Sequence, residues 1–192
     1  MNREEALLLM HRYVQSPGLR SHMLAVEAAM VDYAQELGSD PDRWSLAGLL
    51  HDFDWEIHPS AELHPMAGAP ILREAGAPED VVEAILGHAD HTGIARSSEM
   101  ARALYACDEI TGLITAAALV RPSRSVMDLS VKSVRKKWNN ARFAASVDRD
   151  QIERAAEEFG VDLWGSHVEH VLQSMRRIAA EIGLSGDPAP TR

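Results

Sequence analysis

The chain has 192 residues, a length typical of one domain, and 46% of them are hydrophobic. That share supports a packed core and excludes a disordered acidic chain. Lys and Arg number 19 against 29 Asp and Glu, so the formal net charge is −10. Because phosphate backbones are bound by basic faces, this charge argues against a stable nucleic-acid partner. A small anionic ligand at a local site stays compatible with it.

The sequence predicts a cytoplasmic protein without a membrane partner. The first residues carry Glu4 and Glu5 where a signal peptide needs positive charge. The most apolar run, 110–120, is about half the length of a membrane span. The single cysteine, Cys107, excludes an intrachain disulfide and fits a reducing compartment. The oligomeric state is left open, with a homo-oligomer as one option.

Helix signals follow one another along nearly the whole chain, and no long run alternates with a period of two. Ser16-Pro17 and Asp40-Pro41 each place a capping residue before a proline at the first helical position. Helices are predicted over residues 3–14, 17–37, 41–51, 65–76, 78–88, 97–119, 148–160 and 162–182. We therefore expect one all-α domain, a helical bundle over residues 1–183. The remaining residues, 184–192, are expected to form a disordered tail.

Histidine is abundant, since six of the nine lie between positions 22 and 91. His51 follows Trp44 by seven residues and should face the side of the helix that Trp44 buries. Its neighbour Asp52 lies about 100° further around a helix, so both can point into one site. For this pair alone, a core histidine beside a solvent-facing aspartate is an equal alternative.

Three more polar residues lie on apolar helical faces: His22, His88 and Asp108. Asp108 lies in the most hydrophobic predicted helix, where an unpaired carboxylate is costly. With no basic residue nearby in the sequence, its partner must be a cation or a side chain of another helix. Imidazole and carboxylate groups together are ligands of first-row metals. We therefore expect the side chains of His22, the His51-Asp52 pair and Asp108 to converge.

The order of these residues resembles the H…HD…D pattern of the HD-domain superfamily of metal-dependent phosphohydrolases. Three segments strengthen the resemblance: LLHDFD is similar to the LLHDIG-type segment, HPMAGAPIL to the HPxxGAxIL segment, and YACDEITGL to the terminal aspartate helix. It covers residues 18–120, which would form the metal-site core, with C-terminal helices over 125–183. The chain is most similar to small hydrolases of the HD or HDIG type.

The resemblance implies six metal ligands: His22, His51, Asp52, His64, His88 and Asp108. In two-metal branches Asp52 bridges the ions, and it is the residue expected to be catalytic. The segment HADHTG departs from the usual HHE, which leaves open whether His88 or His91 is the ligand. The implied cofactor is one or two divalent ions of Mn, Fe, Co, Ni or Zn, with Mg as a further option.

The function implied is a phosphomonoesterase or phosphodiesterase. It would act on a small phosphorylated metabolite, such as a nucleotide, through metal-activated water. Two alternatives stay open. A mixed-valent di-iron oxygenase of the same superfamily would need the same ligands. A non-catalytic binding module would have no reason to keep Asp52 and Asp108 in apolar surroundings.

Substrate-binding candidates come from two places. Residues 121–142 carry seven Lys or Arg and one acid, Asp128. This segment is either a solvated face or a phosphate-attracting wall next to the Asp108 helix, with Lys136 as the binding residue. Arg20, two residues before His22, is the second candidate. Asp54 and Glu56, just after the His51-Asp52 pair, are expected at the surface, with proton relay as the alternative.

Overall fold

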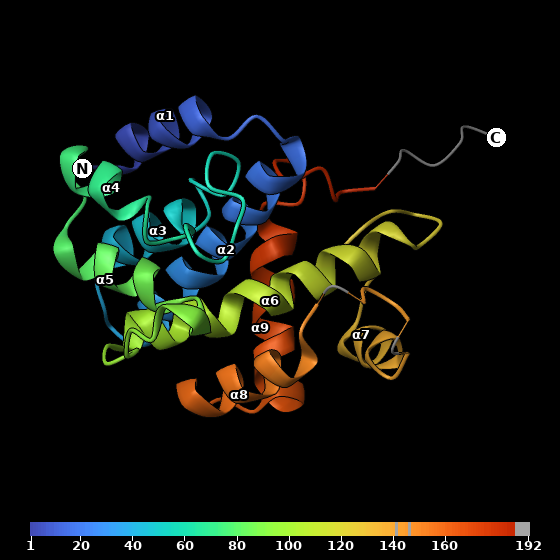
Figure 1. The fold of residues 1–192 in the computed structure, drawn as a ribbon. Coiled ribbons are helices and arrows are strands. Elements are labelled where there is room, and N and C mark those ends of the chain that lie inside the picture. The colour runs from blue at the N-terminus through green and yellow to red at the C-terminus, as the bar shows by residue number, and fades with distance from the viewer. Residues whose placement is uncertain (141, 146, 187–192) are drawn as a thin grey trace.

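The computed structural model describes residues 1–140, 142–145 and 147–186, and these form the all-α domain that the sequence predicts (Figure 1). The helices are α1 (Arg3–Tyr13), α2 (Pro17–Glu36), α3 (Pro41–Leu50), α4 (Ala69–Glu74), α5 (Glu79–Gly87), α6 (Glu99–Leu119), α7 (Val131–Trp138), α8 (Arg149–Phe159) and α9 (Val168–Arg177). Within the described residues, β pairing is limited to one isolated bridge between Ser125 and Ser185. None of the described helices is both long and apolar enough to cross a membrane.

The two long helices α2 and α6 organise the bundle. Helix α2 packs against α3, α6 and α9, and α6 also packs against α5 and α8 (Figure 1). Their buried faces consist mainly of Ala, Val, Leu, Ile and Met side chains, which join one hydrophobic core with the other helices. Removal of these side chains from water is the main stabilising contribution, about 1.5–3 kcal/mol for each large aliphatic residue.

Helices α2 and α3 approach each other closely at Gly48. A Cβ atom at this position would lie 2.7 Å from the Cα atom of Glu27, so only glycine fits without moving one of the helices. The Glu27 carboxylate is buried and accepts hydrogen bonds from Arg3 of α1 and Ser45 of α3. Close backbone packing and a paired charge thus fix the position of α3, and of His51 at its end, relative to α2.

The structure corrects several predicted boundaries. The helix expected from residue 65 begins only at Ala69, because residues 65–68 form turns. The last helix is preceded by a π-helical turn, Leu163–His167, and α9 ends at Arg177 instead of position 182. Helix α7 lies in the basic segment, within the stretch 125–183 where C-terminal helices were expected without bounds for this one.

The expected tail also begins too early. Leu184 is buried, and its carbonyl accepts a hydrogen bond from the Val126 amide. Such a contact, between segments 58 positions apart, leaves no local signal in the sequence. The rest of the expected tail, 187–192, lies outside the described residues.

A buried histidine ties the C-terminal helices to the central ones. His167, on the π-helical turn, accepts a hydrogen bond at Nδ1 from the Tyr33 hydroxyl (2.7 Å). Its Nε2–H donates to the carbonyl of Ala106 in α6 (2.9 Å). Burial lowers the pKa of His167 to about 4, so the ring is neutral at pH 7.

This lowered pKa predicts a loss of stability in mild acid. An unfolded histidine has a pKa near 6.5, so between pH 6.5 and 4 the unfolded chain binds a proton that the folded protein does not. Stability therefore decreases as the pH falls through this window. Between pH 7 and pH 5, we expect the free energy of unfolding of the wild type to fall by about 2 kcal/mol more than that of a His167→Gln variant. Urea unfolding at both pH values measures this difference. An equal loss of unfolding free energy in the two proteins would contradict the lowered pKa of His167.

Candidate metal centre

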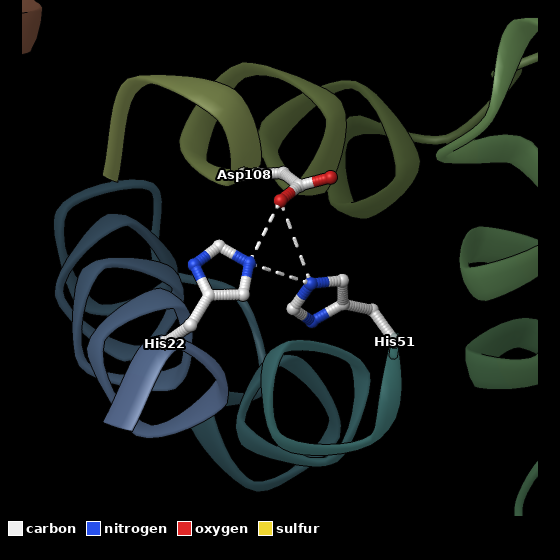
Figure 2. A group of neighbouring side chains, drawn as sticks. All are labelled: His22, His51 and Asp108. Carbon is white, nitrogen blue, oxygen red and sulfur yellow. Dashed lines mark hydrogen bonds and ion pairs between the residues drawn. The ribbon is translucent and has the colours of Figure 1, made fainter. Parts of the chain in front are cut away.

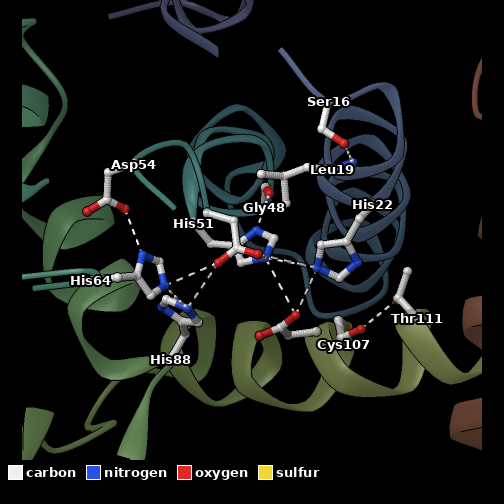
Figure 3. A network of polar contacts seen from close by, with 12 residues as sticks. Ser16, Leu19, His22, Gly48, His51, Asp54, His64, His88, Cys107 and Thr111 are labelled. Carbon is white, nitrogen blue, oxygen red and sulfur yellow. Dashed lines mark hydrogen bonds and ion pairs between the residues drawn. The ribbon is translucent and has the colours of Figure 1, made fainter. Parts of the chain in front are cut away.

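Two clusters of histidine and aspartate side chains meet inside the bundle (Figures 2 and 3). The first consists of His22, His51 and Asp108, and the second of Asp52, His64 and His88. Within each cluster, one potential ligand atom per residue lies within 4.8 Å of the others. Helices α2, α3 and α6 supply the first cluster, so residues far apart in the sequence converge as expected.

The first cluster is compact. His22 Nε2 lies 3.2 Å from His51 Nε2 and 3.0 Å from Asp108 Oδ1. His51 Nε2 lies 3.5 Å from the same carboxylate oxygen. Figure 2 shows the three side chains pointing toward a common centre from three separate helices. Two nitrogens and one oxygen in this arrangement form a donor set suited to a first-row divalent metal.

Asp52 links the two clusters. Its Oδ2 atom lies 3.4 Å from His51 Nε2 and 3.8 Å from His22 Nε2. Its other oxygen, Oδ1, lies 3.2 Å from His64 Nε2 and 3.6 Å from His88 Nε2. Each oxygen therefore faces a different cluster, which is the arrangement of a carboxylate shared by two metal ions.

The imidazole rings are oriented for metal binding by hydrogen bonds on the opposite nitrogen. Three of the four Nδ1 atoms face an acceptor outside the clusters: Gly48 O for His51 (2.8 Å), Ile85 O for His88 and Asp54 Oδ1 for His64 (2.8 Å). A proton held on Nδ1 leaves the Nε2 lone pair directed at the cluster, as metal-binding histidines require. The residues present thus fit one or two divalent ions.

Strong electrostatic coupling joins the two clusters. Burial disfavours a charged His51, but the charges of Asp52 and Asp108 outweigh it and hold the pKa of His51 well above its usual value. In return, His51 lowers the pKa values of Asp52 and Asp108 well below their usual range despite burial, which acts to raise them. A protonated His51 thus balances the charges of Asp52 and Asp108 in the metal-free protein. A bound cation would take over this role and release protons.

Asp54 is a functional candidate that the sequence analysis misplaced. It is fully buried instead of at the surface, and its Oδ1 atom pairs with His64. Burial acts to lower the pKa of His64, but Asp52 and Asp54 together outweigh it and raise this pKa to about 9. A Cβ atom at Gly68 would lie 2.6 Å from Oδ2 of Asp54, so this glycine makes room for the carboxylate. The surface expectation was wrong because α3 ends at Leu50, after which helical spacing no longer predicts direction.

Glu56 lies at the surface, as expected, and has a structural role there. Its carboxylate accepts hydrogen bonds from the backbone amides of Gln15 (2.8 Å) and Ser16 (2.7 Å). These bonds lower the pKa of Glu56 and attach the loop that follows α3 to the start of α2.

Both clusters open into a cavity of about 550 Å³. His88 faces Asp52 from the second cluster, whereas His91 lines the cavity and donates from Nε2 to the carbonyl of His64 (2.7 Å). The geometry therefore places His88, and not His91, among the potential ligands. Glu109 lines the cavity too, and burial together with Asp108 raises its pKa to about 7.

The two predicted substrate-binding residues lie elsewhere. Arg20 donates from Nε to Val14 O (2.7 Å) and from Nη2 to His11 O (3.3 Å), so it caps the end of α1 and does not line the cavity. Lys136 is exposed on α7, beside the C-terminal end of α6, whereas Asp108 lies in the middle of that helix (Figure 1).

No described residue of 121–142 lines the cavity, so the phosphate-attracting wall predicted for this segment is wrong. Instead, Arg121 pairs with Asp128, and Arg135 lies over the ring of Trp164. Closeness in sequence to the end of α6 did not mean closeness in space to Asp108. The solvated-face interpretation fits this placement.

Comparisons with known proteins agree with the geometry. Residues 19–113 match the family model of the HD domain, so the chain carries an HD domain and the predicted superfamily is confirmed. Ribonuclease Y of Oleidesulfovibrio alaskensis is 30% identical over 105 residues, and Ribonuclease Y of two Nitratidesulfovibrio vulgaris strains is 32% identical over 105 residues. These matches cover 54% of this chain and 20% of each relative, so the chain spans about a fifth of their length. No solved structure matches the chain.

The Asp54–His64 pair yields a prediction about metal affinity. Asp54→Asn keeps the shape of the side chain but removes the negative charge that makes His64 a stronger metal ligand. We expect the affinity of the second cluster for Mn²⁺ to fall by about tenfold or more, while the first cluster keeps its affinity. Titration calorimetry of the metal-free protein measures this, with Glu56→Gln as a control in the same loop. Unchanged affinity at both clusters would show that Asp54 has no influence on the metal.

Proposed function

We propose that the protein is a phosphohydrolase that cleaves small phosphate esters and depends on divalent metal ions held by the two clusters. The observation that carries the proposal is the position of Asp52, whose two oxygens face two separate sets of imidazole nitrogens. A single structural ion would need only one set. The match to the HD-domain model supports the same reaction class, because the resemblance noted in the sequence implies a metal-dependent phosphohydrolase.

When bound, two divalent ions polarise a phosphoryl oxygen and lower the pKa of a water molecule toward neutrality. The residues of the chain provide the positions. Asp52 sets the separation of the two clusters, and the Nδ1 hydrogen bonds of His51, His64 and His88 prevent their rings from turning. A cavity of about 550 Å³ lies in the range of small-molecule sites.

RNA is a second candidate substrate, because the relatives are named as ribonucleases. Incubation of the Mn²⁺-loaded protein with a panel of small phosphomonoesters and phosphodiesters, and separately with an RNA oligomer, distinguishes the two. Release of phosphate or of the alcohol from small esters supports our proposal. Cleavage of RNA alone supports the second candidate. Iron content with oxygen consumption, and no hydrolysis, would favour the oxygenase alternative.

Asp52 and Lys136 provide a matched pair of variants. Asp52→Ala removes the carboxylate shared by the clusters, so we expect loss of at least one ion per chain and a roughly thousandfold fall in turnover. Lys136→Ala should change neither quantity, because this side chain is exposed and outside the cavity. Elemental analysis and turnover of the best ester in the panel measure both. A folded Asp52→Ala protein that keeps its full metal content and activity would exclude Asp52 from the catalytic centre.

A further inference from the structure

The wall of the cavity is acidic. Besides five of the six cluster residues, all but His51, three more carboxylates line it, those of Asp90, Glu109 and Asp148. No Lys or Arg is among the described residues that line the cavity. Histidine is therefore the only basic residue type in the described lining, and bound metal ions would supply most of the positive charge that attracts a phosphate.

The three carboxylates differ in how they are compensated. Asp90 is balanced by Arg96 (3.1 Å) and Arg154 (3.2 Å), and it also accepts a hydrogen bond from the Tyr105 hydroxyl (2.8 Å). Its charge is therefore satisfied within the protein.

Glu109 and Asp148 form no ion pair within the described part of the chain. Asp148 is exposed and caps α8 by accepting the Gln151 amide (2.9 Å), while its own backbone N–H faces Glu109. The guanidinium of neighbouring Arg149 turns away and donates to backbone carbonyls such as that of Phe143. Both carboxylates accept backbone hydrogen bonds, but with no ion pair among the described residues each can still act on the charge of a ligand in the cavity.

A ligand that places one phosphate at the two clusters must extend its organic part along this wall. A second anionic group there would meet like charge at short range, whereas a protonated amine would be attracted. Trp55 lines the same cavity with 42% of its surface exposed. An indole ring accepts either an apolar or a cationic group.

We propose that the cavity selects monophosphate esters whose organic part carries no second anion and favours those with a protonated amine, with Asp148 as a specificity-determining residue. This inference rests on the proposed phosphohydrolase function. The inference also predicts that a polyanion such as RNA binds less well than the preferred esters.

The test compares three small esters that differ in the charge of the organic part: 2-aminoethyl phosphate, glycerol 3-phosphate and 3-phosphoglycerate. Binding to the Mn²⁺-loaded protein is measured by calorimetry, and hydrolysis is measured separately by phosphate release. Affinity should decrease in the order given, by about threefold or more at each step.

Two variants separate the cavity wall from the overall charge. Asp148→Asn keeps the cap of α8, because Asn caps a helix as well as Asp. Asp150→Asn also removes one negative charge from the first turn of α8 but lies outside the cavity lining. The affinity ratio of 2-aminoethyl phosphate to 3-phosphoglycerate should fall about fivefold in Asp148→Asn and less than twofold in Asp150→Asn.

Three outcomes would overturn the inference. The wild type could bind 3-phosphoglycerate as tightly as 2-aminoethyl phosphate or more tightly, the two variants could have equal effects, or no ester could bind. The expected order of binding without hydrolysis of any ester would support charge selection and count against the phosphohydrolase function. Preferred hydrolysis of the anionic ester would keep that function and overturn the inference alone.

Discussion

The carboxylate of Asp52 and the imidazoles around it form the interaction on which the rest of the structure depends. Two aspartates and four histidines meet where α2, α3, α5 and α6 pack; three of them are buried and the other three are partly buried. Charges in such a place are costly unless each is matched by an opposite charge or a cation. Protons on His51 and His64 contribute to this match in the metal-free protein, and bound cations would provide it in the loaded one. The same balance that stabilises the bundle also prepares it for metal.

A centre of this kind needs supports that hold its ligands to fractions of an ångström. Gly48 allows α3 to contact the backbone of α2, which brings His51 to His22. Gly68 makes room for Asp54, which holds His64. Both glycines therefore help to position a histidine of the clusters by leaving room for a neighbouring residue. A larger side chain at either position would displace that histidine by pushing this neighbouring residue away.

The sequence was informative where a polar residue interrupts an apolar helical face. His22 and Asp108 were found in that way, while His64 became a candidate only through the resemblance to a known family. Periodicity failed for Asp54, which follows the end of α3, because a turn redirects each side chain by an amount that no spacing rule gives. Arg20 was wrongly expected to bind substrate. Its guanidinium instead donates hydrogen bonds to backbone carbonyls at the end of α1. In each failure the deciding partner is distant in sequence or belongs to the backbone.

The part of the chain that resembles known proteins and the part that shapes the cavity are not the same. Residues 19–113 include all six side chains of the two clusters, so the family match bears on the metal chemistry. Asp148 and Gln151, at the start of α8, lie beyond that stretch and yet form part of the cavity wall. The match to the family model therefore concerns the residues that could hold metal, whereas the charge selection that we propose depends on a wall outside that match. If the proposed function holds, an acidic wall placed against a common metal centre would let one fold apply the same chemistry to a different ester.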